Sequence, residues 1–235
     1  MIGRLGKKTL IASLLLNVVL IIGVGIGVLV VQGTIDEVTQ NLFDRRADAF
    51  AASKMENPDL LFLGDSITHE GSWSEYFPGL TAINRGIGGD TIQHLLDRFD
   101  KIAPLSPGKL FLMIGINNLN SGHTTDEIIP LYGTLFDRFD REMPGTQIYV
   151  QSVLPTNSQW MFSIDLQDVA TLNAHLKAEA AVRGYRFINL DSVFADSTGQ
   201  LHTDLSNDGI HIAGDGYRVW SEYIDKYARE QLAQN

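Results

Sequence analysis

Cysteine is absent from this sequence of 235 residues, and positive charge is scarce. Without cysteine the chain forms no disulfide and carries no lipid on a cysteine, which is compatible with either a reducing or an oxidising compartment. Asn-x-Ser/Thr sequons are also missing, so the sequence gives no sign of N-glycosylation. With 18 Lys and Arg against 28 Asp and Glu, the net charge is −10, which argues against nucleic acid as a partner.

What the N-terminal region does contain is a long apolar run. Residues 9–31 carry no charged side chain, and a helix of that length would be about 34 Å long, enough to cross a hydrocarbon core of about 30 Å. A cleaved signal peptide is the alternative, but its apolar region is usually shorter and ends in a site of the Ala-x-Ala type. No such site stands directly after Val31, where a cleavage site would be expected. We therefore predict an uncleaved transmembrane helix over residues 9–31.

The charges on either side of this run predict its orientation. Three cations precede it and two acids are the first charges after it: Arg4, Lys7 and Lys8, then Asp36 and Glu37. By the positive-inside rule, residues 1–8 form a cytoplasmic tail and the chain after Val31 lies outside the cytoplasm, in the periplasm if the cell is bacterial. That outer part holds 15 Lys and Arg against 28 Asp and Glu, a net charge of −13. We therefore expect membrane contact through the N-terminal helix, not through binding of anionic lipid.

Residues 32–57 show a second kind of helical pattern. Apolar side chains recur at near-helical spacing with charges between them, at Ile35, Val38, Leu42, Phe43 and Phe50. This pattern predicts an amphipathic linker helix. Pro58 disfavours helical backbone at the residue before it, so the following domain is expected to occupy residues 58–235.

This domain alternates between short apolar runs and helical patterns. The candidate strands are residues 60–63, 80–83, 110–114, 147–153 and 185–188. The candidate helices are residues 91–99, a segment from Thr124 through Phe139, residues 165–183 and a segment from Gly214 to near the C-terminus. A capping box at residues 124–127 marks one helix start, and Gly184 marks one helix end. Strands that alternate with helices predict an α/β fold, in which about five parallel strands are covered by helices on both faces.

Polar residues directly follow several of these strands. Ser66 comes after the first strand, the glycine-rich segment 84–91 after the second, and Asn117 after the third. A serine in such a place is more often a helix cap than a nucleophile, so Ser66 alone predicts little. The carboxyl ends of parallel strands, however, meet at one edge of the sheet, where open α/β folds bind ligands. Far downstream, Asp208 stands three residues before His211; a serine with such a pair is typical of a nucleophile, a general base and an orienting acid.

Four segments resemble the signature blocks of the SGNH (GDSL) hydrolase family. They are Gly64-Asp65-Ser66, residues 84–91, Gly115-Ile116-Asn117 and Asp208-x-x-His211. Their order and spacing are specific, and the similarity covers roughly residues 59–223. The second and third blocks most resemble the branch that contains the catalytic subunits of platelet-activating-factor acetylhydrolase Ib, although Asn118 stands where many family members have Asp. The resemblance implies a three-layer, flavodoxin-like sandwich.

The resemblance also implies a role for each site residue. Ser66 is the nucleophile, His211 the general base and Asp208 the carboxylate that fixes the imidazole tautomer. The backbone N–H groups of Ser66 and Gly89 and the side-chain amide of Asn117 form the oxyanion hole. Chemistry of this kind requires neither a cofactor nor a metal ion. His69, close to Ser66 in sequence, either lines the site or has a structural role.

These features predict a membrane-anchored serine esterase that hydrolyses a carboxylic ester through an acyl-serine intermediate. The expected substrate is a small molecule, a glycan with a short O-acyl or acetyl group, or a lipid ester. The alternative from another class is a non-catalytic accessory subunit that uses this fold within a membrane protein complex, because fold alone does not determine function. A homo-oligomer is also compatible with the sequence.

Overall fold

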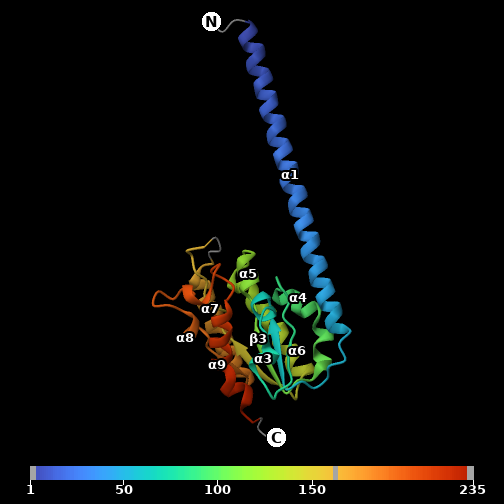
Figure 1. Cartoon of the computed structure of the whole chain (residues 1–235), viewed down its shortest axis with the longest axis vertical. Coiled ribbons are helices and arrows are strands. Elements are labelled where there is room, and N and C mark those ends of the chain that lie inside the picture. Colours follow the sequence, from blue (N-terminus) through green and yellow to red (C-terminus); the bar gives the residue numbers. More distant parts are fainter. Residues whose placement is uncertain (1–3, 161–163, 232–235) are drawn as a thin grey trace. The chain divides into compact units, whose positions relative to one another are not determined.

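The computed structural model describes residues 4–160 and 164–231, and the chain divides into two compact units, residues 1–48 and 49–235. Helix α1 (Arg4–Ala51) accounts for the first unit (Figure 1) and runs without a break through residues 9–31 into the predicted linker helix, which ends at Ala51 instead of residue 57. Its apolar side chains between Leu14 and Val31 are exposed. Among the described residues it is the one helix long and apolar enough to cross a membrane, and a signal sequence would meet the same criteria.

The second unit is built on a five-stranded sheet. Its strands are β1 (Leu60–Gly64), β2 (Ala82–Asn84), β3 (Lys109–Met113), β4 (Gln147–Gln151) and β5 (Arg186–Ile188). All neighbouring pairs are parallel, in the order β2-β1-β3-β4-β5. Every residue of β1 and β3 is buried, as expected for central strands covered on both faces. The predicted parallel sheet of about five strands is confirmed.

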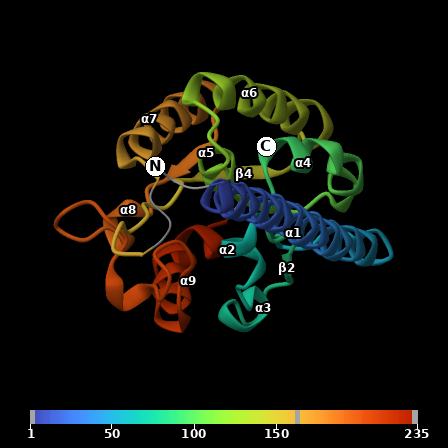
Figure 2. The ribbon, with the colours of Figure 1, turned by 90° about the horizontal axis from the view of Figure 1, so that it is seen from above.

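Helices cover both faces of this sheet. Figure 2 shows α4 (Ile92–Asp97), α6 (Thr125–Glu142) and α7 (Leu166–Arg183) on one side, with α3 (Trp73–Tyr76) and α9 (Gly214–Arg229) on the other. Helix α6 starts after Thr124, whose backbone N–H donates to the Glu127 carboxylate at 2.9 Å, and α7 ends at Gly184. Both predicted helix signals are therefore confirmed, as is the three-layer arrangement.

Several short elements complete the unit. They are α2 (Ser66–His69), α5 (Ile116–Asn120), α8 (Asp191–Phe194) and the 3-10 turns η1 (Phe99–Lys101), η2 (Ala103–Leu105) and η3 (Thr203–Leu205). The predicted helix over residues 91–99 is shorter than expected, because the backbone of Arg98 leaves the helical region and the chain continues into η1.

Stacked aromatic rings hold the central strands against the face covered by α3 and α9. The ring of Phe62 on β1 lies 4.0 Å from that of Trp73 and 5.1 Å from that of Phe111 on β3, measured between centroids. Phe111 in turn stacks at 4.6 Å on Tyr149 of β4. Such contacts fix adjacent strands beyond their burial alone.

The strand order also determines where a ligand site is expected. The chain leaves β1 toward β2 on one side and then returns past β1 to β3 on the other, so the connections diverge between β1 and β3. In open α/β sheets, ligands bind outside the carboxyl ends of the strands at this switch point. Ser66 follows β1 directly and Asn117 follows β3, so both stand at this position.

Candidate active site

Three side chains that are distant in sequence form a hydrogen-bonded series at the sheet edge. The Oγ of Ser66, the first residue of α2, lies 2.9 Å from Nε2 of His211. On the other side of the ring, Nδ1 of His211 lies 2.6 Å from Oδ2 of Asp208. The imidazole and carboxylate side chains are 33% and 37% exposed, so they line an accessible surface. The structure thus brings together the predicted nucleophile, base and acid.

The local fold of the loop that follows η3 orients Asp208. Its Oδ1 accepts the backbone N–H groups of Ile210 at 2.9 Å and of His211 at 2.8 Å, which leaves Oδ2 for the imidazole. Partial burial raises the pKa of Asp208, but the hydrogen bonds from the His211 ring and from these two amides outweigh it and leave the pKa below its usual range. The carboxylate is therefore ionised at neutral pH and can hold the ring as the Nδ1–H tautomer.

The three predicted oxyanion donors lie at the same edge, two in the first turns of the short helices α2 and α5 and one on a loop. Ser66 provides a first-turn amide of α2, which has no acceptor within its own helix. Gly89 is exposed with φ +78°, a backbone conformation that a residue with a side chain rarely adopts. The Nδ2 of Asn117 donates to the carbonyl of Asp90 at 2.9 Å, and an amide nitrogen has a second N–H available for a ligand.

The segment 84–91, here called the glycine loop, packs tightly on α2. Asn84 Nδ2 lies 2.9 Å from the carbonyls of Thr68 and of His69, and its Oδ1 accepts the N–H of Gly86 at 2.8 Å. A Cβ at Gly86 would lie 2.5 Å from the backbone nitrogen of His69, so the close approach requires glycine. The His69 ring accepts the N–H of Gly88 at 3.2 Å, which gives this histidine a contact with the loop.

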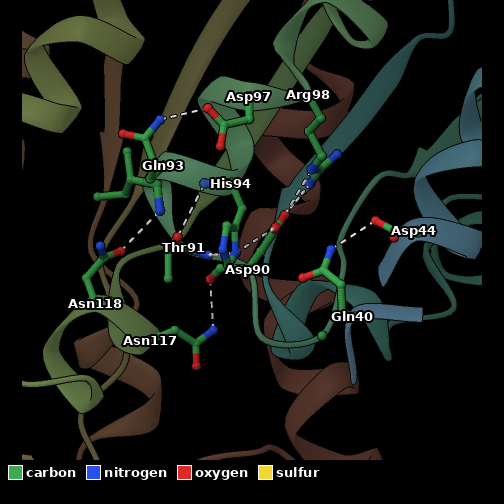
Figure 3. Close-up of polar contacts among 12 residues, drawn as sticks. Gln40, Asp44, Asp90, Thr91, Gln93, His94, Asp97, Arg98, Asn117 and Asn118 are labelled. Carbon is green, nitrogen blue, oxygen red and sulfur yellow. Dashed lines mark hydrogen bonds and ion pairs between the residues drawn. The ribbon is translucent and has the colours of Figure 1, made fainter. Parts of the chain in front are cut away.

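A buried ion pair joins Asp90 of the glycine loop to Arg98, and a buried amide lies beside the loop; the sequence motifs give no role for either (Figure 3). Arg98 Nε lies 3.0 Å from Oδ2 of Asp90, whose side chain is inaccessible to solvent. Burial raises the pKa of Asp90 and lowers that of Arg98, and the contact between them opposes both shifts. Asn118, the departure from the family pattern, accepts the N–H of Ile92 at 3.1 Å, a contact that an Asp would make equally well.

Asp65, the residue before Ser66, is a buried carboxyl group that starts α2. It is 1% exposed and accepts the backbone N–H of Ile67 at 3.0 Å. Burial raises its pKa to about 7, with a further contribution from Asp90, against the opposing effects of the Ile67 N–H and His211. Between pH 4 and 7 the folded protein therefore keeps a proton that the unfolded chain has lost. Because the unfolded state then binds fewer protons, stability falls as pH rises through this range.

We expect Asp65→Asn to remove this pH-dependent loss, because the amide oxygen can still cap α2 and carries no charge. From pH 5 to pH 8 the unfolding free energy of the wild type should therefore fall, relative to that of the variant, by on the order of a few kcal/mol. Denaturant unfolding in detergent, followed by tryptophan fluorescence, measures this difference. Asp126→Asn, at an exposed position in the first turn of α6, is the matched control. Equal pH dependence in Asp65→Asn and wild type would contradict the interpretation.

Comparisons with known proteins show the family to which the chain belongs. The model of the GDSL-like lipase/acylhydrolase family matches residues 62–219. The alpha2 subunit of platelet-activating factor acetylhydrolase IB from Rattus norvegicus is 28% identical over 171 residues, which cover 70% of this chain and 73% of that protein. The alpha1 subunit from Homo sapiens is 27% identical over 196 residues, 79% of this chain and 81% of that protein.

Solved structures share the fold. A GDSL-like lipase from Bacteroides thetaiotaomicron has a TM-score of 0.70 at 23% identity, covering 81% of this chain and 98% of its own. An acetyl-xylooligosaccharide esterase from Geobacillus has a TM-score of 0.59 at 19% identity, and the match covers 77% of this chain and 98% of the esterase chain. The family match spans well over half of the sequence and runs through all four signature blocks. The chain therefore belongs to the GDSL-like lipase/acylhydrolase family and is a hydrolase.

Proposed function

We propose that this hydrolase is a membrane-anchored serine esterase that works through an acyl-serine intermediate on Ser66. The observation that carries the proposal is the hydrogen-bonded series from Ser66 Oγ to His211 Nε2 at 2.9 Å and from His211 Nδ1 to Asp208 at 2.6 Å. A scaffold subunit has no need for a serine, an imidazole and an ionised carboxylate in this order. The arrangement therefore favours the enzyme over a non-catalytic accessory subunit.

The chemistry proceeds in two halves. Ser66 Oγ attacks the ester carbonyl carbon while His211 Nε2 takes the hydroxyl proton, and the tetrahedral intermediate expels the alcohol, which leaves with that proton. Water then attacks the acyl-serine by the same route, and the carboxylic acid is released. During both halves, Asp208 stabilises the imidazolium that forms and keeps the ring in place.

The negative oxygen of each tetrahedral intermediate needs donors that are already in place. We assign this role to the backbone N–H groups of Ser66 and Gly89 and to the side-chain amide of Asn117. These residues follow the carboxyl ends of β1, β2 and β3 at the switch point of the sheet, and the Asp90 carbonyl accepts a hydrogen bond from the Asn117 amide. Removing one donor of this kind typically costs about 10²–10³ in turnover.

The substrate we propose is a short-chain O-acyl ester, acetyl above all, of a glycan or a lipid. The names of two similar proteins support acetyl as the acyl group: one is an acetylhydrolase subunit and the other an acetyl-xylooligosaccharide esterase. The first relative favours a lipid ester and the second a glycan. No nucleic acid and no cofactor enter this reaction.

We further propose that α1 anchors the enzyme, with the N-terminus in the cytoplasm and the hydrolase domain outside it. The length and composition of the helix support a membrane span, and the three cations before it and the acids after it support this orientation. An anchor of this kind keeps the enzyme at the surface where envelope glycans and lipids are found.

One experiment on the full chain tests activity and anchoring together. Membranes from expressing cells are washed with alkaline carbonate and solubilised in detergent, and each fraction is assayed with p-nitrophenyl esters from acetyl to octanoyl. We expect the activity to stay in the washed membranes, to appear in the detergent extract and to be highest for the shortest acyl chains. A folded protein that is inert toward every ester would contradict the esterase. Full release by carbonate would contradict the anchor alone.

A further inference from the structure

The buried ion pair between Asp90 and Arg98 lies next to the proposed oxyanion donors without contacting the catalytic series. Asp90 is 0% exposed and Arg98 is 6% exposed. Two guanidinium nitrogens contact the same carboxylate oxygen, Nε at 3.0 Å and Nη2 at 2.5 Å. Such burial is poorly explained by stability, because the cost of removing two charges from water usually matches or exceeds the attraction between them.

The guanidinium group of Arg98 also connects the two ends of the glycine loop. Its Nη2 donates to the backbone carbonyl of Arg85 at 2.8 Å, while the ion pair holds Asp90 five residues later. Gly88 and Gly89, which lie between these two points, are partly or fully exposed at the edge of the sheet. Gly88 and Gly89 have no side chains to pack, so the shape of this part of the loop depends on the contacts on either side of it.

The same Asp90 is linked to the third proposed donor (Figure 3). Its backbone carbonyl accepts the side-chain N–H of Asn117 at 2.9 Å, so the position of this peptide sets the direction of the amide. Asp90 is therefore held through its carboxylate by Arg98 and through its carbonyl by Asn117. Gly89 directly precedes Asp90 in the chain, and the backbone N–H of Gly89 is another of the proposed donors.

From these contacts we infer that Arg98 and Asp90 are positioning residues that hold the glycine loop and Asn117 in the geometry needed to stabilise an oxyanion. The inference rests on the proposed function, because an oxyanion forms only if the site performs acyl transfer. Neither residue touches the substrate. Their effect is expected on the transition state, because a misplacement of about 1 Å in a catalytic site can cost about 10²-fold in rate.

Arg98→Lys is the substitution that tests this role most directly. Lysine keeps the charge, but its single nitrogen cannot reproduce the three contacts that the guanidinium makes with Asp90 and Arg85. We expect kcat for p-nitrophenyl acetate to fall about 10- to 100-fold, with KM within about threefold of wild type, because the lost interaction matters in the transition state. Arg183→Lys, in an ion-pair network between α6 and α7, is the matched control and should leave both constants unchanged.

A double-mutant cycle with Asn117→Ala separates positioning from a general loss of stability. If Arg98 acts through the oxyanion donors, the loss in the variant with both substitutions should be at least about threefold smaller than the product of the two single losses, because part of the affected interaction is already missing. Additive losses would overturn the inference. So would a folded Arg98→Lys variant whose kcat lies within about threefold of wild type.

Hydrogen exchange provides a readout that does not depend on ester hydrolysis. In Arg98→Lys, the backbone amides of residues 85–91 should exchange at least about tenfold faster, while those of β1 and β3 stay unchanged. Unchanged exchange in the glycine loop would overturn the inference, whereas an inactive wild type would contradict the proposed function instead. If the Arg98→Lys variant does not fold, Asp90→Asn combined with Arg98→Met removes both charges, keeps the side chains similar in size and is measured in the same way.

Discussion

Replacing Ser66 with alanine is expected to reduce ester hydrolysis by about 10⁴-fold or more, the largest effect of any single substitution in this chain. The reason is that the proposed attacking atom is Oγ, which lies 2.9 Å from Nε2 of His211, and alanine lacks it. Removing the γ-oxygen should leave the fold intact, because α2 is capped by Asp65. The measurement is kcat with p-nitrophenyl acetate, together with labelling by a fluorophosphonate probe, which reacts with an activated serine whatever the natural substrate is.

The matched control for this variant is Ser74→Ala, at an exposed position on α3. It should be labelled and should turn over ester like the wild type. If Ser66→Ala were still labelled at the wild-type rate, the reactive nucleophile would lie elsewhere and the proposed mechanism would be wrong.

The second large effect is expected for Asp208→Asn. Asparagine has the same shape, but its amide carries no charge to stabilise the imidazolium, and its NH₂ group can favour the wrong tautomer of His211. The equivalent change at a fully buried carboxylate costs about 10⁴-fold. Here the Asp208 side chain is 37% exposed, so water screens part of its charge, and we expect a loss of about 10³-fold in kcat.

A neighbouring carboxylate serves as the control for Asp208→Asn. Asp204, on η3, has a side chain that is 86% exposed and lies 3.9 Å from His202, which is outside the proposed site. Asp204→Asn should therefore keep wild-type turnover. Comparable losses in the two variants would mean that the net charge of this loop matters, and not the hydrogen bond to His211.

Much of the fold was predictable because its signals are local. Strands β1 and β3 are continuous apolar runs, which is the pattern of strands buried on both faces, and the long helices α6 and α7 have a recognisable start and end. The short helices α2, α3, α5 and α8 were not predicted. Each has four or five residues, too few for a helical repeat to emerge, and their conformation is set by the loops and the core around them.

The site divides in the same way. Ser66, Asn117, Asp208 and His211 could be named from motifs, because their chemical type and their place after strands are visible in the chain. Arg98 could not, since it looks like any charged residue at the end of a helix. Its partners Arg85 and Asp90 lie on a loop with no regular structure, and only the folded chain shows that one guanidinium contacts both.

By itself, the order of residues determined which groups are proposed to do the chemistry and at which edge of a parallel sheet they stand, because strand alternation and motif position are properties of short segments. The tertiary structure decided how those groups are held: which oxygen of Asp208 faces the imidazole, which carbonyl receives the Asn117 amide, and which buried charge pair supports the glycine loop. Contacts of this kind join residues that are far apart or irregularly spaced in the chain. They depend on the directions of side chains after packing, which no local pattern encodes.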